Sequence, residues 1–150
     1  MEPFQLVRND DVIIVAGLVG VIRHWPMLRC WATIFARTKL ALSIAGGWNV
    51  FFGIYSSGNL VSAGVLALGH CSFYRVEPEA VVISAVSTAP NRRGEGLATR
   101  SIMVAMNAMI ERGYTLFYID TKRDNVAMQH AIEKLGFGQP ISNCLQSRTC

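Results

Sequence analysis

The stretch Ser87-Thr-Ala-Pro-Asn-Arg-Arg-Gly-Glu-Gly-Leu-Ala-Thr99 lies between two segments of opposite character. Before it comes an apolar, β-branched run, Ala80–Val86, which is typical of a strand. After it, apolar residues recur at helical spacing through Gly96–Arg112, which predicts a helix. The stretch is therefore predicted to join a strand to a helix, with Pro90 and Asn91 marking the end of the strand.

The start of that helix has the chemistry of an anion site. The first N–H groups of a helix have no partner within it, and the helix dipole adds partial positive charge there. Gly94 and Gly96 let the backbone come close to a ligand, and Arg92 and Arg93 add cationic donors. We predict phosphate binding, with an ordinary strand–turn–helix corner as the alternative. The glycine spacing is not that of the dinucleotide fingerprint, and no Walker-type Gly-Lys-Ser/Thr follows.

A second strand and helix follow the first pair. Gly113 is a plausible C′ residue that ends the helix. Tyr114–Ile119 has the composition of a strand, and Asn125–Leu135 that of a helix. Asp124 or Asn125 is the expected N-cap, and Gly136 the expected stop.

Upstream, a hairpin is predicted from the strand signals of Trp48–Tyr55 and Leu60–Leu68, joined by the turn Ser56-Ser-Gly-Asn59. The elements expected ahead of it are an edge strand at Phe4–Arg8, a helix at Val12–Arg23 capped by Asp10 or Asp11, and a helix at Met27–Ile44.

The order of these elements sets the expected fold class. It runs strand, two helices, three strands, helix, strand and helix, with a final strand possible from Phe137 onward. Such a mixed order predicts an α+β domain around a largely antiparallel sheet. At 150 residues, with no linker visible, the chain is expected to form one domain over residues 1–150.

The composition argues against several classes of protein. The net charge is only +4 and its basic residues are scattered, so no electrostatic footprint for nucleic acid is present. The apolar run Val12–Ile22 is shorter than the roughly 20 residues that span a bilayer, and no basic leader precedes it. We therefore expect no membrane association.

The cysteines do not predict a metal site. Their spacing lacks the close pairs of zinc motifs, and a chain of this size and apolarity does not need disulfides. We expect reduced thiols in a cytoplasmic protein without a bound metal. The four are Cys30, Cys71, Cys144 and Cys150.

Two motifs together resemble the GNAT superfamily of N-acyltransferases. Arg93-Gly-Glu-Gly-Leu-Ala98 is similar to the family signature Arg/Gln-x-x-Gly-x-Gly/Ala, and the turn Thr88–Gly94 before it is frequent in that family. Asn125-Val-Ala-Met-Gln-His-Ala-Ile-Glu-Lys-Leu-Gly-Phe137 resembles the second signature. The resemblance covers roughly residues 48–137 and implies helices on both faces of a mixed, mainly antiparallel sheet with a V-shaped splay between two strands.

The resemblance also implies a site for acetyl-CoA as co-substrate. Backbone N–H groups of Gly94–Thr99 would hold the pyrophosphate, the end of the preceding strand would hydrogen-bond the pantetheine arm, and Asn125 would contact its far portion. The expected cofactor-binding residues are Val86, Ser87, Thr88, Arg93, Gly94, Glu95, Gly96, Leu97, Ala98, Thr99 and Asn125.

The chain departs from the family at two catalytic positions. Ile132 stands where many relatives have a tyrosine general acid, and Ala80 stands where some have a glutamate base. The thiolate could leave unassisted, since a thiol pKa is about 8.5. The candidates for acid and base are Glu79, with Glu77 as a weaker one, His70 and Tyr118. Each also has an ordinary structural role as an alternative.

Three functions follow from this reading. The leading hypothesis is transfer of an acetyl or longer acyl group from acyl-CoA to a primary amine by direct attack. The second is an acyl-CoA-binding regulatory module with little or no catalysis, and the third and weakest is an interaction domain that uses the basic turn. The acceptor is expected to be a small-molecule or peptide amine. A homodimer is possible, because relatives often dimerise.

Overall fold

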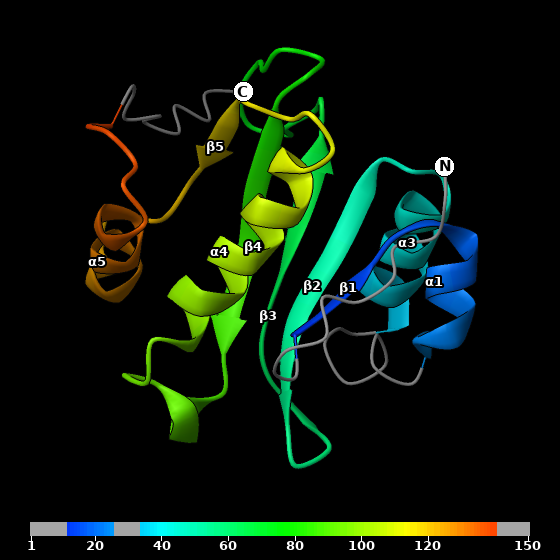
Figure 1. Ribbon diagram of the computed structural model, residues 1–150, viewed down its shortest axis with the longest axis horizontal. Helices are drawn as coiled ribbons and strands as arrows, with labels where there is room; N and C mark the ends of the chain where they lie inside the picture. Colours follow the sequence, from blue (N-terminus) through cyan, green and yellow to red (C-terminus); the bar gives the residue numbers. More distant parts are fainter. Residues whose placement is uncertain (1–11, 26–33, 141–150) are drawn as a thin grey trace, which may run out of the picture.

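The structure, a computed structural model, describes residues 12–25 and 34–140, with the side chains of 34–37 left out. Its centre is a five-stranded sheet in the order β1-β2-β3-β4-β5 (Figure 1). The first four strands are antiparallel neighbours, and β4 and β5 are parallel. The strands are β1 Val12–Val15, β2 Asn49–Ser56, β3 Asn59–Leu68, β4 Val81–Thr88 and β5 Phe117–Ile119. The helices are α1 Gly17–Arg23, α3 Ile34–Ala45, the 3-10 turn η1 Pro90–Arg92, α4 Leu97–Ile110 and α5 Val126–Lys134.

Helices cover both faces of the sheet. In β2, Phe51 and Phe52 point to opposite sides because successive strand residues alternate. Phe51 packs with Ile44 of α3, and Phe52 belongs to the cluster that contains Ile102 of α4. The predicted α+β fold with helices on both faces of a mainly antiparallel sheet is therefore confirmed.

The expected helix Val12–Arg23 is wrong in its first part. Val12–Val15 forms β1 and pairs antiparallel with Phe51–Ile54 of β2, and the helix begins only at Gly17. The four consecutive β-branched residues of Val12–Val15 favour a strand, and they form backbone hydrogen bonds with the edge of β2. Gly17, with a φ of +66°, then turns the chain into the helix.

Other expectations also shift at their boundaries. The strand expected at Tyr114–Ile119 is reduced to the three residues of β5. The helix expected at Met27–Ile44 is confirmed from Ile34 onward, where it forms α3. Its first part and the strand expected at Phe4–Arg8 lie outside the described residues. From Phe137 to residue 140, where the description ends, the chain forms no strand.

The sheet opens between β4 and β5. These strands pair only at Val81–Phe117, Val82–Tyr118 and Ile83–Ile119, although β4 continues to Thr88. This is the predicted V-shaped splay: in the described part of the chain, the pairing of β4 with β5 ends at Ile83.

A bulge lies in β4 just beyond this opening. Ser84 pairs with Val65 and Ser87 with Ala63, so Ala85 and Val86 both lie opposite Gly64. Ala85 has a φ of +52°, which is uncommon for a residue with a side chain. Bulges of this kind bend a strand and re-aim its groups beside active sites.

Candidate functional site

The loop before α4 presents open backbone donors. Gly94 and Gly96 have φ values of +84° and +73°, in the left-handed region that favours glycine. Gly96 is the N-cap of α4 and makes no side-chain capping hydrogen bond, and the first turn Leu97–Arg100 contains no acidic residue. A Cβ at either glycine would meet no atom of the described residues within 4 Å. The helix start is therefore exposed, positively polarised and sterically open to an anion.

The two arginines of the loop point to different partners. Arg92 makes a bidentate ion pair with Glu95, with Nε–Oε1 at 2.7 Å and Nη2–Oε2 at 2.8 Å, and also donates to Ser56 Oγ at 3.3 Å. The hydrogen bonds from Arg92 lower the pKa of the Glu95 carboxyl. Arg93 Nε donates to the carbonyl of Thr88 at 3.4 Å. Of the two arginines expected to bind phosphate, Arg92 is therefore already engaged in contacts with Glu95 and Ser56 that stabilise the loop.

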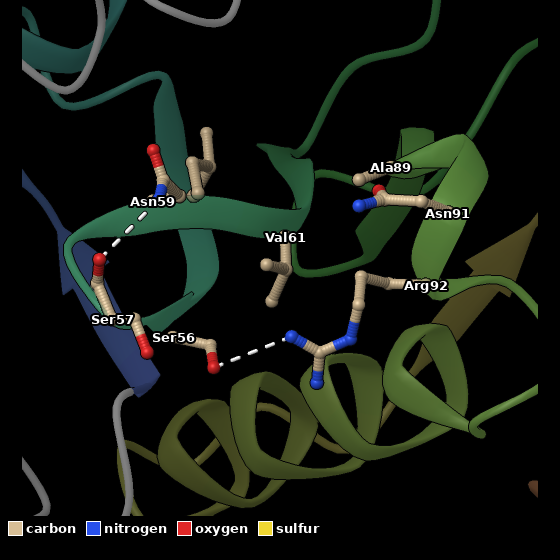
Figure 2. A pocket seen from close by; sticks show the side chains of 8 residues that line it. Ser56, Ser57, Asn59, Val61, Ala89, Asn91 and Arg92 are labelled. Carbon is tan, nitrogen blue, oxygen red and sulfur yellow. Dashed lines mark hydrogen bonds between the residues drawn. The ribbon is translucent and has the colours of Figure 1, made fainter.

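Arg92 also borders a hollow of about 340 Å³ between the β2–β3 hairpin and η1. Figure 2 shows its guanidinium reaching from η1 toward Ser56 at the hairpin turn. The contact ties the loop before α4 to the β2–β3 hairpin. The residues that line the hollow are Ser56, Ser57, Asn59, Leu60, Val61, Ala89, Asn91 and Arg92.

Buried hydroxyls hold the corner between β4 and α4. Ser62 Oγ of β3 lies 3.4 Å from Thr88 Oγ1 and 3.3 Å from Ser101 Oγ, and Ser101 donates to the carbonyl of Ala98 at 3.0 Å. Ser62 and Ser101 are almost fully buried, so these bonds are made in a setting where an unpaired hydroxyl is costly. A lone serine within each apolar segment was the only sequence signal of this network.

Asn125 lies at the start of α5. Its Oδ1 accepts a hydrogen bond from Met128 N at 3.2 Å, which confirms it as the N-cap of the helix. Since Oδ1 serves the helix, the side-chain amide Nδ2 is the atom that can donate to a ligand.

The predicted acid and base residues gather near the beginning of β4 but make different contacts. Tyr118 Oη donates to Glu77 Oε2 at 2.9 Å, and this bond raises the pKa of the Tyr118 hydroxyl. Glu79 is exposed two residues before β4, and His70 is exposed with Nδ1 3.1 Å from the Leu68 carbonyl oxygen. The structure joins Tyr118 to Glu77, a pairing not predicted from the sequence. Among the described residues, neither Glu79 nor His70 forms a hydrogen bond with this pair.

Asp120 was not singled out from the sequence. It directly follows Ile119, the last residue of β5 that pairs with β4, and so stands at the apex of the splay. Partial desolvation raises the pKa of its carboxyl, although the residue as a whole is exposed. The available signal was an acidic residue at the carboxyl end of a predicted strand, where open α/β sheets bind ligands.

The described residues contain neither a metal-binding group nor a membrane span. Within 12–25 and 34–140, no three His, Cys, Asp or Glu side chains are grouped to hold a metal ion. Over the same ranges, no helix combines the length and apolarity needed to cross a bilayer.

Comparison with solved structures identifies similar folds. The aminoglycoside acetyltransferase AAC(6')-Iy, in complex with the bisubstrate analogue CoA-S-monomethyl-acetylneamine, is 18% identical with a TM-score of 0.69, over 93% of this chain and 99% of that one. AAC(6')-IG from Acinetobacter haemolyticus is 19% identical with a TM-score of 0.63, over 92% and 99%. A ribosomal-protein-alanine N-acetyltransferase from Brucella melitensis biovar Abortus 2308 is 17% identical with a TM-score of 0.62, over 89% and 96%.

The sequence comparisons add the family. No curated protein sequence matches the chain. The model of the acetyltransferase (GNAT) family matches residues 24–137, which span both the loop before α4 and the Asn125 helix. The chain belongs to the GNAT acetyltransferase family.

Proposed function

We propose that the protein transfers an acetyl group from acetyl-CoA to a primary amine. The observation that carries the proposal is the open start of α4, with Gly94 and Gly96 in left-handed conformations. This helix start follows β4, which diverges from β5 after Ile83 and continues to Thr88. A phosphate group at the helix start and an extended arm along β4 match these two features.

The residues present fit acetyl-CoA. Backbone N–H groups of Gly94–Thr99 would hold the pyrophosphate, with Arg93 beside them, and the segment Val86–Thr88 at the end of β4 would hydrogen-bond the pantetheine arm. Asn125 Nδ2 would donate from the far side of the slot. When bound, acetyl-CoA supplies the activated thioester that carries the acetyl group.

Asp120 is the base that the geometry favours among the carboxylates and His70. Glu79 and His70 lie at the amino end of β4, whereas the splay begins after Ile83, about four residues or roughly 13 Å further along the strand. Asp120 stands at the splay itself. Its carboxylate would take a proton from the acceptor ammonium, directly or through water, leaving a neutral amine to attack.

The remaining steps need few groups. The neutral nitrogen would add to the thioester carbonyl, and the backbone N–H near Val86 would stabilise the resulting tetrahedral oxyanion. The C–S bond would then break, and the remaining extra proton on the nitrogen would pass to water or to the thiolate. Ile132 cannot donate a proton to the thiolate, and Tyr118 already donates its hydroxyl hydrogen to Glu77. The thiolate therefore leaves unassisted or takes its proton from water.

The acceptor we propose is a small-molecule amine. Support comes from the similar fold of two aminoglycoside N-acetyltransferases. A peptide amine is the alternative, because a ribosomal-protein-alanine N-acetyltransferase also has a similar fold. A panel of amino sugars, diamines and peptides, assayed by thiol release from acetyl-CoA, separates these classes.

The competing function is a non-catalytic acyl-CoA-binding module, favoured by Ile132 and Ala80. Acetyl-CoA at about 100 times its Kd stabilises a protein by about 2.7 kcal/mol, which is roughly 5–10 °C in Tm for a domain of this size. This shift together with thiol release establishes the transferase, the shift without release on any amine establishes the module, and the lack of a shift excludes both.

Asn125 allows stability and cofactor binding to be separated. Asn125→Asp keeps an acceptor for Met128 N but loses the Nδ2 donor, so we expect unchanged stability and an acetyl-CoA Kd raised roughly 10-fold. Asn125→Ala loses the cap as well and should cost about 1 kcal/mol in unfolding free energy. Urea unfolding and calorimetric titration measure the two effects. Equal Kd values for wild type and Asn125→Asp would rule out the contact.

A further inference from the structure

An aromatic and acidic cluster lies on one face of the sheet beside the slot. It consists of Tyr74, Glu77 and Tyr118. Tyr118 Oη donates to Glu77 Oε2 at 2.9 Å, and the rings of Tyr74 and Tyr118 meet edge to face with centroids 6.3 Å apart. We call these three residues the Tyr–Glu cluster.

The cluster lies on the face opposite α4. Phe117 and Ile119 of β5 pack into the hydrophobic cluster that contains Ile102 and Met109 of α4. Because strand residues alternate, Tyr118 between them points to the other face. Tyr74 and Glu77 reach that face from the loop between β3 and β4.

The cluster also lies near the proposed reaction centre, toward the amino end of β4. The cofactor arm would run from the start of α4 back along β4 and bring its acyl end to the apex of the splay near Ser84. Tyr118 pairs with Val82, two strand residues or about 7 Å before Ser84. An acceptor that approaches the apex from the side away from the cofactor loop therefore passes over these residues.

The chemistry of the cluster suits a cation. A carboxylate and tyrosine rings attract an ammonium by charge and by cation–π interaction. Glu77 is exposed, and the hydrogen bond from Tyr118 holds its carboxylate beside the ring. Arg75 is close in sequence, yet in the described part of the chain no ion pair joins it to Glu77.

We propose that the Tyr–Glu cluster binds a second ammonium group of a diamino or polyamino acceptor while the first amine reacts at the splay. The inference rests on the proposed function and adds a recognition site to it. It makes Glu77 and Tyr118 determinants of acceptor specificity, distinct from the proton acceptor Asp120.

Matched amines test the proposal. Cadaverine and n-pentylamine have the same chain length but differ in the second ammonium, so acetylation of both is followed by thiol release. We expect the KM of the wild-type protein for cadaverine to be roughly 10-fold lower than for n-pentylamine, with similar kcat, because one charged contact is gained. Glu77→Gln should reduce this preference to within about 2-fold, and Tyr118→Phe, which keeps the ring, should reduce it partly.

The control is Glu111→Gln, which removes an exposed carboxylate at the end of α4 and should keep the full preference. An acetyl-CoA-induced Tm shift in each variant confirms that it folds. Thiol release with both amines but no preference in the wild type, or an equal KM change for both amines in Glu77→Gln, would overturn this inference alone. No release with either amine, when another amine of the panel is acetylated, would also overturn this inference alone. No release with any amine of the panel would overturn the proposed function and this inference with it.

Discussion

Replacing Gly96 with valine abolishes the stabilisation of the protein by acetyl-CoA. Gly96 has a φ of +73° at the N-cap of α4, where only glycine adopts the conformation without strain. A valine there costs about 1–2 kcal/mol if the backbone is kept, and its methyl groups occupy the space where a phosphate would approach the helix N–H groups. We expect the Kd for acetyl-CoA to rise at least about 100-fold, measured by calorimetry and by the lost Tm shift.

The matched control lies at the other end of the same helix. Gly113 has a φ of +90°, and a Cβ there also meets no described atom within 4 Å. Gly113→Val therefore introduces similar backbone strain far from the proposed phosphate site. It should lower the Tm of the free protein to a similar extent and keep the acetyl-CoA shift. Retention of that shift in Gly96→Val would refute the assignment of this loop to the cofactor.

Replacing Asp120 with asparagine lowers kcat by roughly 100-fold or more, the usual effect of removing a general base. Acetyl-CoA binding should be unchanged, because Asp120 directly follows β5 and does not belong to the loop before α4. Burial raises the pKa of this carboxyl, so the wild-type rate should rise with pH as the group ionises, above the usual aspartate range. This rise of the rate with pH should be absent from the pH profile of Asp120→Asn.

A change in stability cannot explain the expected fall in the kcat of Asp120→Asn. The folded-state pKa of Asp120 is raised, so its ionised form disfavours folding at neutral pH, and this penalty disappears below the unfolded-state pKa. Asp120→Asn should thus be at least as stable as the wild type at neutral pH in urea unfolding. Asp124→Asn, an exposed aspartate ahead of α5, should keep its turnover. If Asp120→Asn also retained turnover, the base would have to be sought at Glu79 or His70.

Local signals explain why parts of the site were predictable. The loop before α4 was identified from its glycines, its arginines and the change of periodicity around it, all of which lie within residues 80–112. The Asn125 cap was likewise visible, because a capping side chain acts on the helix that it begins. Arg92 was placed only in part, since its nearness to the loop was evident but its hydrogen bond to Ser56, 36 residues away, was not.

By itself, the sequence determined the strand-to-helix corner, the β2–β3 hairpin and the two C-terminal helices, because turn residues and apolar periodicity act between near neighbours. The tertiary structure alone decided that Val12–Val15 is a strand, since that depends on the free edge of β2. It also decided that Asp120 stands at the apex of the splay and that Tyr118 meets Glu77 across 41 residues of sequence. Strand pairing and its register join distant segments, so no local pattern could specify which side chains would meet there.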